Sequence, residues 1–203
     1  MNSSSENLKI KIIGVGEEGE NILKRFAKED MSEIELIAVD VDGSALNKLS
    51  KTGAIRTVLI GKNIAMGLEG ATLGERAAEE SAEDIKKAVD NAKAVVMVAT
   101  LGGKAASGAT PVIARLAKEL KIPVVAVMSM PFLFEGARRH RLALGAIDKL
   151  KPVCDELLVN RNDELVEQMQ NKKESKVSDL FKEANNVVCE KIRAKLDELK
   201  SAE

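Results

Sequence analysis

A glycine-rich stretch near the N-terminus, GVGEEGEN (residues 14–21), has the spacing of a phosphate-binding turn. It follows an apolar run and precedes a helical pattern, and Gly14, Gly16 and Gly19 fit the G-x-G-x-x-G fingerprint of dinucleotide-binding turns. In such turns, backbone amides at the start of the helix hold the anion. The stretch therefore indicates a phosphate site where an apolar strand ends.

The same stretch carries three acidic side chains that argue against a simple phosphate site. Glu17, Glu18 and Glu20 place carboxylates where a phosphate group is best served by bare amides. A carboxylate about 4 Å from a phosphate near a protein surface costs up to roughly 4 kcal/mol. Whether this turn holds a nucleotide, and which nucleotide, is the central question that the sequence raises.

A second glycine-rich loop, TLGGKAASGATP (residues 100–111), lies between another apolar run and another helical pattern. The amides of Gly102 and Gly103 and those from Ala105 to Gly108 are expected to point into the turn, with the positive end of the helix behind them. A mononucleotide whose phosphates are held from two sides needs such a second loop, whereas a dinucleotide does not. The alternative is a plain connection from strand to helix.

Polar residues also follow the other apolar runs. Asp40 and Asp42 follow one run, where a carboxylate of a dinucleotide enzyme would bind ribose hydroxyls, and Glu135 follows another. Asn160 and Asn162 come at the end of the last run, and asparagine amides suit hydrogen bonds to a base or a ribose. Each asparagine alone is equally typical of a turn or a helix cap.

Alternating elements position these loops. The strand-like runs fall at residues 8–14, 34–40, 56–60, 94–100, 122–129 and 154–159. The helical patterns fall at residues 18–29, 75–91, 108–119, 136–150, near 163–170 and from about 176 to 200. This order predicts an α/β fold with a Rossmann-like, mainly parallel sheet flanked by helices and a long C-terminal helix. Ligands of such sheets bind at the carboxyl ends of the strands.

Composition excludes several classes of function. The 203 residues carry a net charge of −1, with four Phe and no Tyr or Trp, so no nucleic-acid partner is expected. Cys154, Cys189 and the single His140 offer neither a metal cluster nor a histidine-based triad. With no apolar stretch near 18 residues and no secretion signal, we expect no membrane segment and a cytoplasmic location.

Taken together, the ordered motifs resemble the nucleotide-binding domain of the FtsZ/tubulin family. They are GVGEEGEN, AVDVDGSAL, GLEGATLGERAAEES, GGKAASGATP, PFLFEGARR, NRND and LFKEANNVV, and they span residues 8 to 190 in family order. The resemblance implies a disordered tail over residues 1–7, a nucleotide-binding domain over 8–175, and a long helix over 176–203 packed on that domain.

The resemblance also implies a guanine-nucleotide site with defined roles. Phosphates would lie on the first and fourth loops, the ribose at Glu135 with Arg139 beside it, and the guanine base at Asn21 and Asn162 under Phe181. The residues implied for nucleotide binding are Gly14, Gly16, Gly19, Asn21, Asp42, Gly70, Ala71, Gly102, Gly103, Lys104, Ala105, Ala106, Ser107, Gly108, Glu135, Arg139, Asn162, Phe181 and Asn185. No catalytic residue and no protein metal ligand is implied.

The chain departs from the family pattern at several of these positions. Ala105 stands where the phosphate signature has threonine, Lys104 introduces a cation, and Asn185 replaces a common acid at the base. An amide accepts hydrogen bonds more weakly than a carboxylate, so we expect a weaker preference for guanine. The sequence ends at Glu203 in a polar stretch, before the family's acidic catalytic loop and second domain, which predicts a single-domain member.

These observations lead to one main hypothesis and three alternatives. The main hypothesis is an FtsZ-like protein of the division or cytoskeletal type that binds GTP or GDP, with Mg²⁺ as an optional ion, and hydrolyses GTP weakly or not at all alone. Its partners would be itself, as a dimer or filament, or a full-length FtsZ-like protein.

The alternatives differ in the ligand or in the source of catalysis. The chain could be a GTPase activated by a partner, or a nucleotide-free structural or regulatory homologue in which Glu17, Glu18 and Lys104 fill the old pocket with an ion-pair network. A nicotinamide-dependent dehydrogenase is the outside alternative, and it leaves GGKAASG, PFLFEG and Asn162 unexplained.

Overall fold

The computed structural model describes residues 9–29, 32–64, 70–169 and 176–201. The tail expected at residues 1–7, most of the charged run at 170–176 and the first part of the loop GLEGATLG lie outside these described residues.

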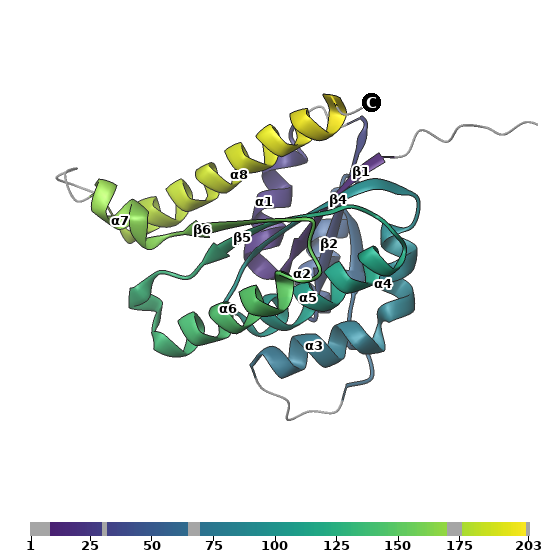
Figure 1. The fold of residues 1–203 in the computed structure, drawn as a ribbon, viewed down its shortest axis with the longest axis horizontal. Helices are drawn as coiled ribbons and strands as arrows, with labels where there is room; N and C mark the ends of the chain where they lie inside the picture. The colour runs from purple at the N-terminus through teal and green to yellow at the C-terminus, as the bar shows by residue number, and fades with distance from the viewer. Residues whose placement is uncertain (1–8, 30–31, 65–69, 170–175, 202–203) are drawn as a thin grey trace, which may run out of the picture.

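A six-stranded sheet forms the centre of the molecule (Figure 1). Its strands are β1 (Lys9–Val15), β2 (Ile34–Asp40), β3 (Arg56–Leu59), β4 (Ala92–Thr100), β5 (Val124–Met130) and β6 (Glu156–Arg161). The order is β3-β2-β1-β4-β5-β6, and every neighbouring pair is parallel. The predicted parallel α/β sheet is therefore confirmed, and the chain reverses its direction of winding between β1 and β4, which is where ligands of such sheets bind.

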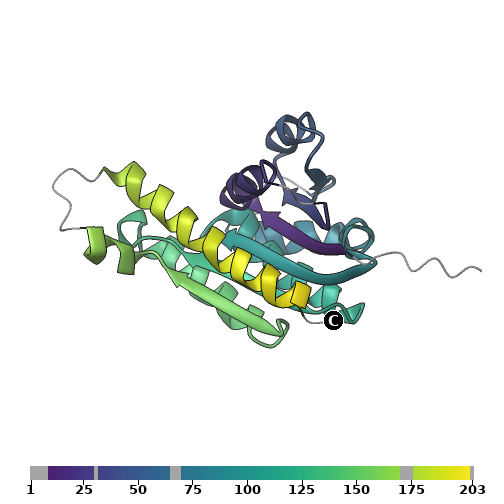
Figure 2. The same ribbon diagram turned by 90° about the horizontal axis from the view of Figure 1, so that it is seen from above.

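Helices cover both faces of the sheet (Figures 1 and 2). One face carries α1 (Gly16–Phe26), α2 (Gly43–Ser50) and α8 (Val177–Ser201), whose apolar residues share one core with β1 and β4. The other face carries α3 (Ala71–Glu80), α4 (Ala82–Val89), α5 (Lys104–Glu119) and α6 (Ala137–Leu150). A single turn of 3-10 helix, η1 (Leu133–Glu135), and α7 (Asp163–Met169) follow β5 and β6. None of the described helices is both long enough and apolar enough to span a membrane.

The long helix α8 packs on the domain, as expected, and buries one of its sides. Val188, Ile192 and Leu196 are buried in the core shared with the sheet, and Ala184 is buried in a separate cluster with Phe132 and Leu165, whereas Val177 at the start of the helix is 57% exposed. Lys195, whose side chain is 17% exposed, pairs with Glu156 of β6 at 2.8 Å. The helix therefore lies along β5 and β6 (Figure 2), and most of its exposed positions are polar, among them Arg193, Asp197 and Lys200.

Three helices differ from the sequence expectation. The helix expected over 75–91 is two helices, α3 and α4, separated at Ser81. Helix α2 was not expected, because only Leu46 and Leu49 are buried in its eight residues; Asp42 caps it by accepting from the amides of Ser44 and Ala45. Helix α5 begins at Lys104, four residues before the expected 108, so most of the second glycine-rich loop forms the first two turns of the helix.

Helices α3 and α5 touch backbone to backbone through two glycines. A Cβ atom on Gly108 would lie 1.9 Å from the Ala71 carbonyl oxygen, and one on Gly74 would lie 2.4 Å from the Ala105 carbonyl oxygen. Both distances are far shorter than a van der Waals contact. A backbone carbonyl group cannot move aside to relieve such a clash, whereas the end of a flexible side chain can. Glycine at these positions is therefore a requirement of packing.

We predict that Gly108→Ala lowers the free energy of unfolding by about 1–3 kcal/mol, because the added methyl group forces α3 and α5 apart. Urea unfolding followed by circular dichroism measures this change. Gly145→Ala, on the exposed side of α6 with no atom near the new methyl group, is the matched control. It should raise stability by about 0.5–1 kcal/mol. Equal stability of Gly108→Ala and the wild type would contradict the packing role.

Candidate functional site

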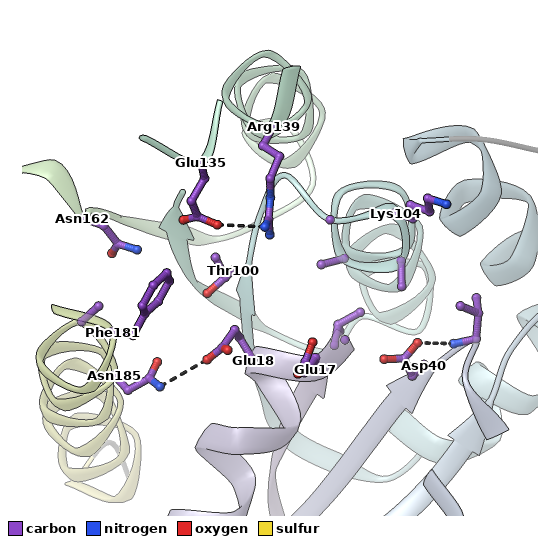
Figure 3. A pocket seen from close by; sticks show the side chains of 17 residues that line it. Glu17, Glu18, Asp40, Thr100, Lys104, Glu135, Arg139, Asn162, Phe181 and Asn185 are labelled. Carbon is purple, nitrogen blue, oxygen red and sulfur yellow. Dashed lines mark hydrogen bonds and ion pairs between the residues drawn. The ribbon is translucent and has the colours of Figure 1, made fainter. Parts of the chain in front are cut away.

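A cavity of about 450 Å³ opens at the carboxyl edge of the sheet (Figure 3). It lies beyond the ends of β1, β2 and β4, and the residues after β5 and β6 and the first turns of α8 close it. Its lining residues are Val15, Gly16, Glu17, Glu18, Asp40, Val41, Thr100, Gly103, Lys104, Ala105, Ala106, Glu135, Arg139, Asn162, Phe181, Ala184 and Asn185. Segments far apart in the sequence thus meet at the edge where a ligand was expected.

Two helix N-termini open into this cavity. Helix α1 begins at Gly16 and α5 at Lys104, and residues of both first turns line the wall. The N-cap residues, Val15 and Gly103, provide no capping side chain. The first amides of a helix have no partner within the helix, so these two ends present unpaired N–H groups and partial positive charge to the cavity. Such an arrangement favours an anionic group.

The predicted glycines divide into two groups. Gly16 and Gly103 line the cavity, whereas Gly14, Gly19, Gly102 and Gly108 do not. A Cβ atom on Gly14 would lie 2.6 Å from the Gly19 carbonyl oxygen, so this pair allows β1 and α1 to approach closely. Gly102 has a φ of +96° and its amide donates to the Ser107 hydroxyl at 2.7 Å, which braces the turn.

At the other end of the cavity, three aromatic rings support one wall. The ring of Phe181 lies edge-on to Phe132, with centroids 5.1 Å apart, and to Phe134, with centroids 6.3 Å apart. Phe132 and Phe134 stack at 4.9 Å. Of the three, only Phe181 lines the cavity, where Figure 3 shows it between Asn162 and Asn185. The cluster fixes one aromatic ring beside two amide side chains.

A chain of hydrogen bonds fixes the amide of Asn162, which is only 2% exposed. The Lys191 ammonium donates to the Asn160 carbonyl oxygen at 3.2 Å, and the Asn160 amide donates to the Asn162 carbonyl oxygen at 3.0 Å. The Asn162 NH₂ group is left for the cavity side (Figure 3). Sequence reasoning did not identify Lys191, because it lies on α8 more than one turn beyond Asn185.

Glu18 bridges α1 and α8 across the floor of the cavity. One carboxylate oxygen accepts from the Asn185 amide at 3.2 Å, and the other accepts from Asn21 at 3.4 Å. The Asn185 amide nitrogen is thus engaged, and its carbonyl oxygen remains available. Asn21, expected at the base, does not line this cavity; its own carbonyl oxygen accepts from Lys24 at 3.0 Å.

Glu135 and Arg139 form an ion pair on the wall opposite α1. Their shortest contact is 2.8 Å, and Glu135 also accepts from the Phe132 amide at 2.8 Å (Figure 3). Both residues were predicted at the ribose and both line the cavity. The ion pair orients the two side chains relative to each other.

The alternative of an ion-pair network between Glu17, Glu18 and Lys104 is wrong for the described residues. Lys104 is exposed, and Figure 3 shows its side chain directed away from both carboxylates. Glu18 pairs instead with amide groups, because α8 places Asn185 beside it. Among the described residues, no ion pair between these three side chains fills the cavity.

The remaining predicted residues lie away from the wall. Asp42 caps α2, and Gly70 and Ala71 form the start of α3, beside α5. Ser107 is buried in the turn that it braces. Thr100, which sequence reasoning did not select, lines the cavity at the end of β4. Its position at the end of a strand-like run is the feature of the sequence that could have identified it.

A second cavity, between α1 and α2, shares Glu17 and Asp40 with the first. Glu20, on its wall, is 3% exposed, and its Oε1 atom has no hydrogen-bond partner. Burial raises the pKa of Glu20 to about 7, and the nearby Asp40 carboxylate adds to this shift. Burial also raises the pKa of Asp40, although the backbone amides of Asp42 and Val41 donate to it and oppose the change.

We predict that Glu20 makes stability depend on pH. In the unfolded chain Glu20 loses its proton near pH 4.5, whereas in the folded chain it keeps that proton up to about pH 7. The folded state thus binds more protons in this window, and the free energy of unfolding falls by up to about 3 kcal/mol as pH rises from 4.5 to 7.

Urea unfolding of wild type and Glu20→Gln at pH 5 and pH 8 tests this, because the glutamine cannot ionise and should lack the fall. Glu83→Gln, at an exposed position on α4, serves as control and should follow the wild type. The same pH dependence in Glu20→Gln and the wild type would contradict the assignment.

Comparison with known proteins places this geometry in a family. A family profile described as "Tubulin/FtsZ family, GTPase domain" matches residues 9–170. Among solved structures, the empty FtsZ dimer of M. jannaschii is similar with a TM-score of 0.80 and 33% identity, covering 90% of this chain and 52% of that chain. The GTPγS-bound CetZ2 protofilament of Haloferax volcanii is similar with a TM-score of 0.73 and 26% identity, covering 91% of this chain and 57% of that chain.

A further CetZ, from Methanosaeta thermophila, has a TM-score of 0.75 at 18% identity and shows the common fold alone. This chain spans a little over half the length of each of these structures. Because the profile match covers most of the 203 residues, this chain belongs to the tubulin/FtsZ family and contains its GTPase domain.

Proposed function

We propose that this chain binds a guanine nucleotide, GTP or GDP, in the cavity at the carboxyl edge of the sheet. The observation that carries the proposal is the pair of uncapped helix starts, α1 and α5, that open into one cavity. Their free amides suit the phosphate groups, as in other helix N-termini that bind anions. The domain over residues 8–175, with the helix over 176–203 packed on it, would be the binding unit.

The opposite end of the cavity suits the base. Phe181 offers a ring face or edge to a purine, and Asn185 offers a carbonyl oxygen because its amide nitrogen donates to Glu18. The Watson–Crick edge of guanine presents N–H donors, which an amide oxygen accepts, while the Asn162 NH₂ group suits an acceptor on the purine. These two amides fit guanine, which we propose over adenine because the matching family profile is that of a GTPase domain. An amide oxygen accepts from the guanine N–H groups less strongly than a carboxylate would.

Magnesium is proposed to arrive with the nucleotide. Among the described residues, no three His, Cys, Asp or Glu side chains are grouped so as to hold a metal ion. The described residues alone thus offer no chelating set, and phosphate oxygens would supply the ligands. When bound, Mg²⁺ would neutralise phosphate charge next to the acids of the first loop.

Hydrolysis by the chain alone is proposed to be weak. Three of the four carboxylates on the cavity wall are engaged elsewhere: Glu18 with Asn185, Glu135 with Arg139, and one oxygen of Asp40 with two backbone amides. The fourth, Glu17, is exposed at the start of α1 beside the proposed phosphate position. Phosphate release, measured alone and with a full-length family member, tests this. Release that appears only in the mixture would favour a GTPase activated by its partner.

The role of the chain is proposed by analogy with its relatives. The M. jannaschii FtsZ is a dimer and the Haloferax volcanii CetZ2 is a protofilament, so we propose a cytoplasmic protein of the division or cytoskeletal type that associates with itself or with a full-length relative. Sedimentation velocity with and without GTP would test this association. A monomer under all conditions, alone and mixed with FtsZ, would contradict it.

We predict that nucleotide extracted from the purified protein is GDP or GTP, and that GTP binds more tightly than ATP by calorimetry. Phe181→Ala should weaken GTP binding by about 1–3 kcal/mol, the usual value of stacking a base on an aromatic ring. Phe134→Ala is the matched control, because Phe134 belongs to the same ring cluster but does not line the cavity. An empty protein that also ignores added GTP would overturn the proposal.

We also predict that Glu17→Gln binds GTP more tightly than the wild type, by about tenfold, because it removes one negative charge beside the proposed phosphate position. Glu17 is exposed at the start of α1, so the change leaves the core intact. Calorimetry at low and high salt measures the effect, which should shrink as salt rises. Glu83→Gln is again the control; a Glu17→Gln affinity equal to or below that of wild type would place the phosphates elsewhere.

A further inference from the structure

The second cavity, between α1 and α2, has a volume of about 550 Å³ and an acidic wall. Its lining residues are Glu17, Glu20, Asn21, Lys24, Asp40, Asp42, Ala45, Lys48, Leu49 and Thr52. Four carboxylates face two ammonium groups, so the wall carries an excess of negative charge. Glu17 and Asp40 also line the first cavity, and the two cavities therefore lie on either side of the same acids.

Glu20 indicates that a donor is missing from this cavity. Its side chain is 97% buried, at 3% relative exposure, and Oε1 is buried without a hydrogen-bond partner. A buried carboxylate oxygen without a partner carries an energetic cost, and such groups in native proteins call for a specific explanation. Asp40, 7% exposed, is the nearest source of further negative charge. A cationic donor in the cavity would satisfy both side chains.

The chemistry of the wall distinguishes between kinds of cation. Within the described part of the chain, no three His, Cys, Asp or Glu side chains are placed to chelate a metal ion. Asp42 is occupied as the cap of α2, and Asp40 accepts two backbone amides through one oxygen. Single carboxylate oxygens spread over a roomy cavity suit separate ammonium groups that each donate hydrogen bonds.

We propose that the cavity between α1 and α2 binds a small organic polyamine, with one ammonium group donating to Glu20 and Asp40 and another near Asp42 and Glu17. Glu20 and Asp40 are buried whereas Glu17 and Asp42 are exposed, which gives two anionic positions at different depths, and the apolar atoms of Ala45 and Leu49 on the same wall suit a methylene chain. Lys24 is held by Asn21 at 3.0 Å and Lys48 is exposed, so neither fills the position next to Glu20 Oε1.

The protonation state of Glu20 gives the site a measurable signature. Because the pKa of Glu20 is raised to about 7, roughly half of the molecules carry its proton at pH 7. An ammonium group binds the ionised form, so binding at pH 7 should release about half a proton. The charged groups that face Glu20 or line its cavity, from α1, β2 and α2, are Glu17, Lys24, Asp40, Asp42 and Lys48.

Occupancy of this cavity would also change the nucleotide cavity, a consequence that rests on the proposed function. Glu17 and Asp40 lie between the two cavities, and a cation on one side reduces their repulsion of phosphates on the other. Each ligand then raises the affinity of the other by the same factor. The acids of the first loop would thus belong to a cation site next to the phosphate site.

Titration of the nucleotide-free protein with spermidine tests the site directly. At constant ionic strength and pH 7, in two buffers of different ionisation enthalpy, we expect binding with release of about half a proton. Glu20→Gln should weaken binding about tenfold and abolish the proton release. Lys48→Gln, a change at an exposed position, should strengthen binding severalfold, and Glu83→Gln should leave it unchanged.

Several outcomes would overturn the site. No binding of spermidine, or equal binding by wild type and Glu20→Gln, would do so, provided that circular dichroism shows the variant folded. Binding of Mg²⁺ alone that depends on Glu20 and excludes spermidine would replace the organic cation with a metal ion. Lys48→Gln gives a check that does not depend on changing a buried residue.

A second titration, with GTP in the presence and absence of saturating spermidine, tests the coupling. At a spermidine concentration that just fills the wild-type site, we expect GTP affinity to rise about fivefold or more in the wild type and clearly less in Glu20→Gln, which controls for spermidine that binds GTP itself. GTP binding that ignores spermidine would overturn the coupling. Absence of GTP binding, with spermidine binding intact, would refute the proposed function and leave the cation site standing.

Discussion

The close approach of β1 and α1 through Gly14 and Gly19 is the contact on which the site depends. Any side chain on either glycine would meet the backbone of the other, so only glycine lets the helix begin directly at the edge of the sheet. That contact fixes the first amides of α1 at the carboxyl ends of β1 and β4. It also fixes the carboxylates of Glu17, Glu18 and Glu20, which the same first turns carry.

Positive and negative electrostatic potentials therefore meet at the carboxyl edge of the sheet. The starts of α1 and α5 present positive potential and free amides, while the acids of the first loop and of the β2 end present negative charge. Two of the acidic side chains point away from these amides. Glu18 turns toward Asn185 on α8, and Glu20 turns toward the second cavity, so their charges lie to either side of the amides of the turn.

The sheet and the edge at which the first cavity opens were predictable from the sequence, because buried parallel strands are continuous in Val, Ile and Ala and glycine-rich turns mark their carboxyl ends. Helix α2 was not, since two buried leucines in eight residues leave little periodicity. Because α2 also encloses Glu20, the second cavity could not be predicted from the sequence either. The partners of Glu18 and Asn162 depend on where α8 lies across the sheet, and no local pattern near either residue encodes that placement.

The contact between α3 and α5 has a mechanical consequence. Where helices meet through long side chains, a small displacement of one is absorbed by rotamer changes in the layer between them. Here the Gly108 and Gly74 contacts leave no such layer, and the carbonyl groups of one helix rest on the other. A displacement of the first turn of α5 therefore displaces α3 by a similar amount, and the two helices move as one rigid unit on their face of the sheet.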